Sequence, residues 1–355
     1  MRQLYITVFA LLLCSQSYAQ TPGDTIKTMT LNEVVVQGNT NKRIQMQSPL
    51  GVLSVSKTFI KENFAGSLMQ SLEKIPGVQA MSVGSGQSKP AIRGLGFNRM
   101  IVAENGIKHE GQQWGEDHGL EIDQFAVDAI EVIKGPGSLL YGSDAIGGVV
   151  SLNTNYIPRQ KFGGSVNLFT RTNNESYGLS AQLLGRSKSF FYKAQLTVID
   201  YGDYKIPADS IQYYSYFIKL KDRRLRNTAG SFGWITDRYR SIFNISNVYA
   251  QSGFFADAHG LEVRLSEIDY DRSSRDIDYP YHSANHLKVA NTSSWYLGDF
   301  ILKSNLSYQN NYRKEMVEPV SHGYMPTPPD NLERKFDKDI YTAHLQADIR
   351  LGEQH

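Results

Sequence analysis

The chain has 355 residues and a formal net charge of +2 at pH 7, a length that allows two domains with separate cores. The small charge and the lack of a long basic block exclude a nucleic-acid partner. The single cysteine, Cys14, lies in the N-terminal leader, so the mature chain has no internal disulfide and no cysteine zinc cluster.

The first 19 residues are typical of a secretory signal peptide. An apolar core at Ile6–Cys14 precedes a small-x-small cleavage site at Ser17–Ala19. This run is shorter than the roughly 20 apolar residues of a transmembrane helix. Lipidation at Cys14 is disfavoured because Leu13 before it is bulky. The sequence therefore predicts export, and any membrane position would need a closed β-barrel.

Residues 20–50 are polar and rich in turn-forming residues, which predicts a flexible segment. Inside it stands a β-branched run, Leu31–Val36, which gains nothing from burial in a flexible tail. Such a run suits strand addition to another protein's sheet edge, where backbone hydrogen bonds supply affinity. The alternative is an edge strand of the domain that follows.

Residues 51–155 predict a compact α/β domain. The apolar spacing at Phe64–Ile75 predicts a helix that Pro76 ends. The long block Ile130–Asn153 predicts a buried strand, a glycine-proline turn, a short helix and a second strand. The other expected elements are strands at Val52–Ser56, Ala91–Gly94 and Met100–Ala103, a turn at Glu104–Gly106 and a loop at Lys108–Ile122.

From residue 160 to residue 355 the pattern changes to period two. In Tyr341–Leu351, odd positions are apolar or aromatic and even positions are polar. Long strands with one apolar face are typical of outer-membrane barrels, whereas strands of a soluble β-sandwich average about five or six residues. Eight strands are expected, at 162–171, 176–186, 189–201, 228–237, 240–251, 286–297, 299–312 and 340–351, with long loops at 202–227, 252–285 and 313–339.

Four short motifs resemble those of the plug domain of TonB-dependent outer-membrane receptors, with a Bacteroidetes-like character. They span about a hundred residues in the order that this family has, and these receptors are energised importers of Gram-negative bacteria. The resemblance implies a mainly β protein, with an α/β plug followed by a transmembrane antiparallel β-barrel. The motifs are Ile75–Val78, Ile92–Leu95, Asn105-Gly106 and Glu131–Pro136.

Eight strands are too few for the complete barrel that the resemblance implies. An eight-stranded barrel has room only for side chains, whereas plugged transporters have 22 strands. A plug of about 105 residues has a radius of gyration near 13 Å. We therefore expect the N-terminal portion of a longer receptor, truncated or split.

The resemblance also assigns coupling and locking residues. Arg93 and Lys134 match plug cations that pair with barrel glutamates, which we expect beyond residue 355. Lys134 departs from the arginine usual in the family, and a lysine holds a carboxylate less rigidly. The alternative for Arg93 is a solvated strand residue. The six residues that match the Ton box, which TonB binds, are Leu31, Asn32, Glu33, Val34, Val35 and Val36.

The loop Lys108–Glu121 corresponds by family position to the plug apex, where cargo binds. Histidine and carboxylate suit zinc or copper. The pair Asp117 and His118 resembles the loop of the zinc-acquiring branch and is the expected metal site. The alternative is a loop that is polar by chance. Any of His344, His282 and His286 could complete a metal site. The ligand-binding candidates are His109, Glu110, Trp114, Glu116, Asp117 and His118.

The sequence thus predicts an outer-membrane receptor that imports a scarce nutrient, with an iron-siderophore or similar iron chelate as the default cargo. Zinc or copper uptake is the alternative within the family. Expected partners are TonB with its inner-membrane complex, the metal chelate or ion, outer-membrane lipid and optionally a surface lipoprotein. No cofactor is implied. Gly135–Gly137 lacks the Gly-Lys-Ser/Thr of a phosphate loop. A surface adhesin and a periplasmic enzyme are the alternatives from other classes.

Overall fold

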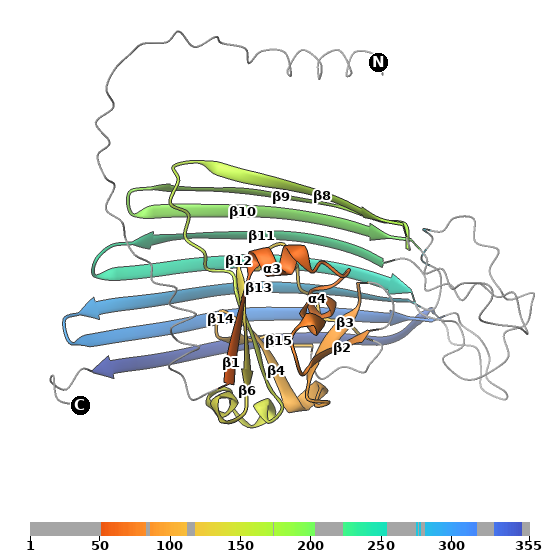
Figure 1. Ribbon diagram of the computed structural model, residues 1–355, viewed down its shortest axis with the longest axis horizontal. Coiled ribbons are helices and arrows are strands. Elements are labelled where there is room, and N and C mark those ends of the chain that lie inside the picture. The colour runs from red at the N-terminus through yellow and green to blue at the C-terminus, as the bar shows by residue number, and fades with distance from the viewer. Residues whose placement is uncertain are drawn as a thin grey trace, which may run out of the picture. The chain divides into compact units, whose positions relative to one another are not determined.

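The computed structural model describes residues 51–82, 86–111, 118–172, 174–202, 223–253, 275, 277, 281–317 and 330–349. The predicted signal peptide and the Leu31–Val36 segment lie outside these residues. The described chain contains an α/β part, residues 51–153, which we call the plug, and an eight-stranded sheet, which we call the wall (Figure 1). Both belong to one compact unit, residues 41–355.

The plug is built on a five-stranded sheet in the order β1-β6-β7-β4-β5, in which only β4 and β7 are parallel. Its strands are β1 (Gly51–Ser56), β4 (Met100–Glu104), β5 (Ile107–Lys108), β6 (Ala129–Lys134) and β7 (Gly148–Asn153). A hairpin of β2 (Val78–Ser82) and β3 (Ser88–Ile92) lies beside it, with helices α3 (Lys57–Glu62) and α4 (Leu68–Ser71). Single 3₁₀ turns occupy Leu72–Lys74, Phe97–Arg99, Pro136–Tyr141 and Ser143–Ala145.

The predicted helix Phe64–Ile75 is wrong in extent. Gly66 has φ +102°, a conformation that ends helical geometry, and Ser67 then caps α4 through a hydrogen bond from the Gln70 backbone N–H. Phe64 therefore leaves the expected helical face, and its ring lies 4.7 Å from that of Phe169 in the wall. No helix among the described residues has the length and apolar character needed to span a membrane.

The plug has its own apolar core. Leu72, Ile92 and Ile130 have no exposed surface and pack together with the β4 and β7 strands. Gly148, at the start of β7, has φ +134°, and a Cβ there would lie 2.7 Å from the Ile133 carbonyl oxygen. A glycine at this position is thus required both by backbone conformation and by close packing.

The wall is an antiparallel sheet in which each strand pairs with its neighbours in sequence, and the eight predicted strands are confirmed. Several strands begin earlier or run further than predicted, into segments expected to be loops. The period-two apolar signal is weak there, because charged and other polar residues dominate the added strand ends. The strands are β8 (Gly163–Arg171), β9 (Ser176–Ser187), β10 (Phe190–Tyr201), β11 (Arg223–Ile235), β12 (Tyr239–Gly253), β13 (Tyr281–Leu297), β14 (Phe300–Met316) and β15 (Leu332–Ile349).

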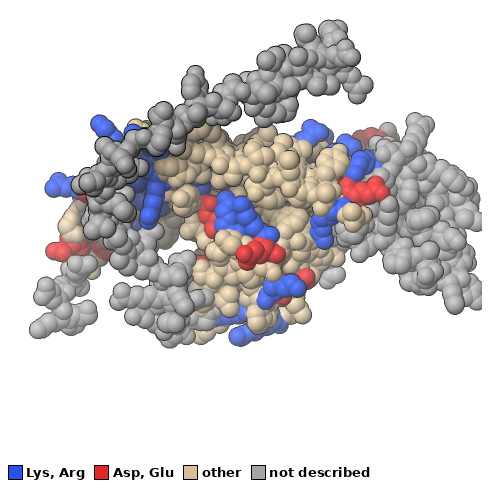
Figure 2. All heavy atoms as spheres, turned by 45° about the horizontal axis from the view of Figure 1, so that its top comes forward, with Lys and Arg blue, Asp and Glu red and all other residues tan. Residues whose placement is uncertain are grey.

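The two faces of the wall differ as the alternation predicts. On β10, Leu196 and Val198 point outward and are exposed, whereas Gln195 and Thr197 are buried toward the plug. Figure 2 shows a broad band with few charged side chains across the upper part of that view, with Lys and Arg toward its ends. An apolar outer face with a polar inner face is the pattern of a barrel in lipid.

Candidate functional site at the contact between plug and wall

The predicted apex loop leaves the plug at β5 and reaches the wall. His109 is held by a 2.8 Å hydrogen bond from its backbone N–H to the Val102 carbonyl. Glu110 forms an ion pair of 2.8 Å with Lys338 on β15. Three predicted ligand-binding residues of this loop, Trp114, Glu116 and Asp117, lie outside the described residues.

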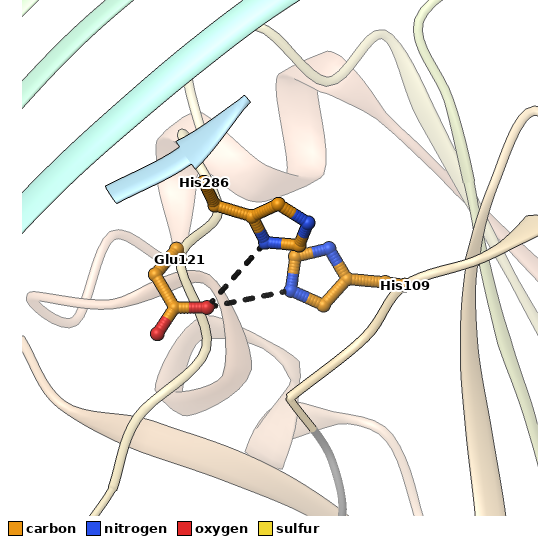
Figure 3. A group of neighbouring side chains, drawn as sticks. All are labelled: His109, Glu121 and His286. Atoms are coloured by element: carbon orange, nitrogen blue, oxygen red, sulfur yellow. Dashed lines mark ion pairs between the residues drawn. The ribbon is translucent and has the colours of Figure 1, made fainter. Parts of the chain in front are cut away.

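A buried trio forms where this loop meets β13. Glu121 Oε2 lies 3.9 Å from His109 Nε2 and 3.6 Å from His286 Nδ1, and the two imidazole rings are 4.7 Å apart (Figure 3). The two histidines are completely buried, and Glu121 is 3% exposed. His109 and Glu121 come from the plug, whereas His286 comes from the wall. The trio therefore joins two parts of the fold that are distant in sequence.

Hydrogen bonds from the wall fix the orientation of His286. The Gln309 amide donates to the Lys108 carbonyl at 2.9 Å, so its oxygen faces His286 Nε2 at 3.3 Å. This oxygen can only accept, so Nε2 carries the proton and donates it. The Asn311 amide lies 3.3 Å from Nδ1. In the neutral ring Nδ1 is then a lone-pair acceptor on the side of Glu121.

The electrostatics of the trio follow from its burial. Burial, together with the nearby charge of Lys288, holds the pKa of His109 well below its usual value of 6.5. Burial would raise the pKa of Glu121, but His286 and Arg313 beside it lower this pKa to about 2. Neither ring nitrogen of His109 has a hydrogen-bond partner, and neither has Glu121 Oε2. At neutral pH the trio therefore holds a carboxylate at Glu121 and a neutral imidazole at His109.

A second polar cluster lies around His118. Its Nε2 is 3.0 Å from Glu315 Oε1 on β14, and its ring stacks on that of His282 with centroids 5.1 Å apart. His282 Nε2 in turn lies 3.0 Å from the Gln87 amide nitrogen. The two wall histidines that the sequence offered for one site, His282 and His286, thus divide between two clusters. His344, the third candidate, is exposed on β15, opposite Asn305.

Asp123 accepts three hydrogen bonds, two of them from the wall. Its carboxylate accepts bonds from the Phe125 backbone N–H at 2.9 Å, from the Thr197 hydroxyl at 2.7 Å and from the Asn227 amide at 2.6 Å. Burial nevertheless raises its pKa above the usual 3.8. Asp123 thus ties the segment after the apex loop to β10 and β11.

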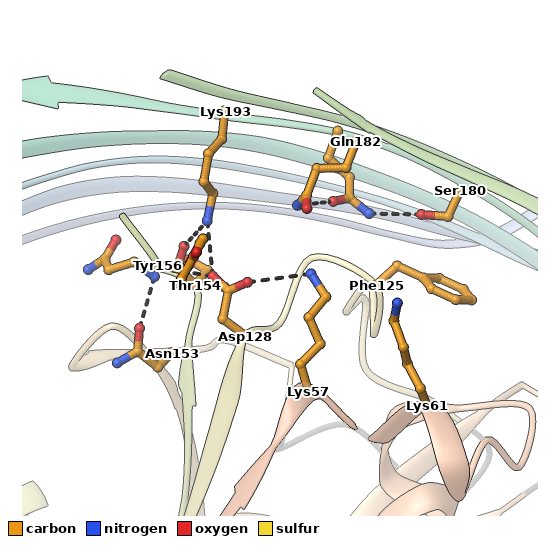
Figure 4. Close-up of polar contacts among 12 residues, drawn as sticks. Lys57, Lys61, Phe125, Asp128, Asn153, Thr154, Tyr156, Ser180, Gln182 and Lys193 are labelled. Atoms are coloured by element: carbon orange, nitrogen blue, oxygen red, sulfur yellow. Dashed lines mark hydrogen bonds and ion pairs between the residues drawn. The ribbon is translucent and has the colours of Figure 1, made fainter. Parts of the chain in front are cut away.

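Ion pairs link the five-stranded sheet to the wall. Lys193 of β10 reaches across to Asp128 at 3.0 Å, and Lys57 approaches the other oxygen of Asp128 at 3.4 Å (Figure 4). Lys288 of β13 pairs with Glu104 at the end of β4. A cavity of about 50 Å³, lined by Lys193 and Lys288 among others, lies in this contact region. The contact combines these ion pairs with the aromatic patch of Phe64, Phe125 and Phe169 and with buried apolar wall residues, which include Ile199, Leu225 and Val248.

The two predicted lock cations lie together. Arg93 follows β3 in a turn at φ +52°, and the Lys134 amino group donates to the Pro76 carbonyl. A Cβ built on Gly77 would have both side chains within 4 Å. Burial and the charge of Arg93 lower the pKa of Lys134. Within the described residues neither cation pairs with a carboxylate, and the expected glutamate partners stay a prediction.

Two interface residues, Asp123 and Asp128, were missed by the sequence analysis. A signal was available, since both are acidic residues set among apolar ones in Ile122–Ile130. Acidic side chains are rarely buried unless they are paired. What the sequence could not supply was the partners, which come from distant strands.

The family model for the TonB-dependent receptor plug domain matches residues 44–149. The chain is 32% identical over 356 residues to the vitamin B12 transporter BtuB of Vibrio vulnificus (strain CMCP6), covering 92% of this chain and 57% of that protein. The chain belongs to the TonB-dependent receptors. It is also 27% identical over 242 residues to the hemin receptor of Yersinia enterocolitica, covering 64% of this chain and 34% of that receptor.

Solved TonB-dependent receptors share this fold. The siderophore receptor PirA from Acinetobacter baumannii has a TM-score of 0.64 at 16% identity, covering 86% of this chain and 45% of that one. The ferric enterobactin receptor PfeA from Pseudomonas aeruginosa has a TM-score of 0.63 at 18% identity, covering 87% and 47%. This chain spans about a third of the length of the hemin receptor and nearly three fifths of the length of BtuB. Its family membership makes it an outer-membrane protein.

Proposed function

We propose that this chain forms the plug and the first wall strands of a receptor that imports an iron chelate by energy-coupled displacement of the plug. The observation that carries the proposal is the polar contact between plug and wall. Asp123, Asp128 and Glu104 meet wall donors, and such bonds exchange for water at small net cost. A plug with its own core and a polar outer contact suits movement as a unit.

The cargo class is supported by the names of the relatives. Besides the hemin receptor and BtuB, the chain is similar to an iron-regulated outer-membrane virulence protein of Vibrio cholerae and a ferrioxamine B receptor of Salmonella typhimurium. Most of these names refer to iron or its chelates. An iron-siderophore or similar iron chelate is therefore the cargo that we propose.

Energy coupling in this proposal runs through TonB. The segment Leu31–Val36 would add a strand to TonB, as its β-branched composition favours. Arg93 and Lys134, which lie side by side on the plug, would pair with barrel glutamates outside this chain until TonB pulls. The polar contacts at Asp123 and Asp128 would then open with the plug.

The test uses a bacterium that lacks the gene, complemented with the full-length receptor or with Val34→Pro. Proline removes a backbone donor from the added strand. Uptake of ⁵⁵Fe-labelled siderophores and of hemin is measured together with surface binding. We expect Val34→Pro to bind cargo but not import it, and Thr40→Pro, outside the six residues, to import normally. Equal import by Val34→Pro and the wild type would overturn the coupling proposal.

A second candidate, uptake of zinc or copper ions, is favoured by the His118 cluster. His118 lies 3.0 Å from Glu315 and stacks on His282, and its neighbour Asp117 is the other predicted ligand. Transcript levels under separate starvation for iron, zinc, copper and cobalamin distinguish the two. Induction by iron starvation alone supports the chelate receptor. Induction by zinc or copper starvation, without induction by iron starvation, supports ion uptake. Loss of ⁶⁵Zn or copper uptake in His118→Ala would then identify the site.

A further inference from the structure

The buried trio of His109, Glu121 and His286 has hydrogen-bonding capacity that the protein leaves unused. Both ring nitrogens of His109 and one oxygen of Glu121 are inaccessible to solvent and have no hydrogen-bond partner. Leaving a buried polar atom unpaired typically costs about 1–3 kcal/mol. The neutral ring of His109 carries one hydrogen, so its other nitrogen and Glu121 Oε2 each offer a lone pair, and a single cation between them would satisfy both.

The donor set matches a transition-metal ion. Two imidazole nitrogens and one carboxylate oxygen are the ligand types of zinc sites and of other first-row metal sites. The three ligand atoms lie within 4.8 Å of one another. Metal–ligand bonds of about 2.0–2.1 Å place neighbouring ligand atoms of a tetrahedral site roughly 3.3–3.5 Å apart. Small side-chain rotations from the present 3.6 Å and 3.9 Å separations would reach this geometry.

Neighbouring residues also fix the tautomer and the orientation of His286, one of the three ligands. Gln309 accepts the Nε2 proton of His286 and is itself fixed by the Lys108 carbonyl. A hydrogen bond at one ring nitrogen sets the tautomer that offers the other nitrogen to a metal, and this is the usual outer partner of a metal-bound histidine. Nδ1 of His286 faces Glu121 with its lone pair, and a metal would take this lone pair over from the Asn311 amide, which lies 3.3 Å away.

We propose that His109, Glu121 and His286 bind one divalent transition-metal ion, which clips the plug to the wall. Two ligands come from the plug and one from β13, so the ion bridges the surfaces that separate when the plug moves. His109 also lines a cavity of about 30 Å³ between the two parts, which has room for a water molecule as a fourth ligand. The site is independent of the cargo that the receptor imports.

Nearby cations set the strength of this site. Lys288 is neutralised by its ion pair with Glu104, whereas Arg313 is fully buried and acts on Glu121. Its positive charge opposes a second cation in the same region. We therefore expect weaker binding than at a closed structural zinc site, with full removal by a chelator. A clip that can be removed is compatible with a plug that is displaced during transport.

The test titrates Zn²⁺ into the full-length receptor, purified in detergent and stripped with a chelator. Stoichiometry and affinity come from competition with a chromogenic chelator, and thermal unfolding is followed with and without zinc. We expect the wild type to bind zinc and to unfold at a higher temperature when zinc is bound. His109→Ala and His286→Ala should each bind one equivalent of zinc fewer than the wild type. The control His344→Ala, at an exposed histidine of β15, should bind as much zinc as the wild type.

Two further variants keep the result decisive. Gln309→Leu retains all three ligands and should bind zinc about 10–100-fold more weakly, as for other outer-partner substitutions. His118→Ala should keep the equivalent that His286→Ala loses, which separates the two clusters. The proposal is overturned if the wild type binds no zinc, or if the trio variants keep wild-type stoichiometry and affinity. Iron-chelate uptake is measured separately, so that absence of the metal site and absence of the proposed transport function give different results.

Discussion

The interior of the plug and the contact between plug and wall are built from different interactions. Inside the plug, Leu72, Ile130 and Val150 are completely buried among other apolar side chains. At the contact, Asp123 and Asp128 face hydroxyl, amide and ammonium groups of the wall. Apolar packing is lost outright when it is opened, whereas polar groups regain water. The difference indicates a plug that holds together while its attachment is released.

The largest expected effect is in the plug core. Leu72→Ala should lower the free energy of unfolding of the plug by about 2–5 kcal/mol, because a fully buried leucine leaves a cavity. Urea titration with hydrogen exchange of plug peptides measures this loss. Leu139→Ala, at a leucine that is 66% exposed, is the matched control and should change little. Equal losses in the two variants would show that the plug core is not what holds the plug together.

The next effect is at the contact. Asp128→Ala leaves Lys193 and Lys57 without their carboxylate and should weaken plug attachment by about 1–3 kcal/mol. Protection of the β10 and β6 peptides from hydrogen exchange should fall, while that of β4 and β7 stays. Asp348→Ala, which breaks an exposed pair with Lys303, should change neither. Loss of protection throughout the plug in Asp128→Ala would remove the distinction between core and contact.

The pH dependence of stability separates two carboxyl groups whose pKa values are shifted in opposite directions. The pKa of Asp123 is raised by burial, so its stabilising contribution is complete below 3.8 and is lost as the pH rises through the raised pKa. With a chelator present, the wild type should therefore lose stability relative to Asp123→Asn between pH 4 and neutral. Urea unfolding at a series of pH values measures this difference. No change in the difference across that range would contradict the burial of this charge.

The smallest effect is at Asp144, an exposed plug residue paired with Lys108 at 2.6 Å. The hydrogen bond and charge of Lys108 lower its pKa. Its contribution is therefore present above 3.8 and is lost as the pH falls through the lowered pKa. The wild type should lose a little stability relative to Asp144→Asn in acid, the reverse of the Asp123 result. The same sign for both residues would show that burial does not distinguish them.

The sequence predicted the wall better than the contact. In long strands such as β10, the period-two alternation predicts which residues lie on each face of the sheet. The predicted count of eight strands and the partial barrel are confirmed. The starts of β11 and β15 were missed because charged residues dominate them, and the isolated Leu225, Leu332 and Phe336 are too few to give an alternating apolar signal. The helix at Phe64–Ile75 failed because one glycine, Gly66, has a backbone conformation that the apolar spacing does not reveal.

Within the candidate site, the sequence identified residue types but not their grouping. His109 and His286 were both candidates, yet the expected metal site was Asp117 with His118. The pairing of His286 with Glu121 depends on how the β13 strand faces the docked plug. A single sequence carries no record of that alignment between distant segments.

Hydrogen exchange of the purified full-length receptor in increasing urea tests the distinction between core and contact most directly. Local openings of different stability appear as separate losses of protection. We expect peptides that carry Asp123 and Asp128, and the facing stretch of β10, to lose protection at lower urea than β4 and β7. Simultaneous loss in all of these peptides would contradict a plug that is released as an intact unit.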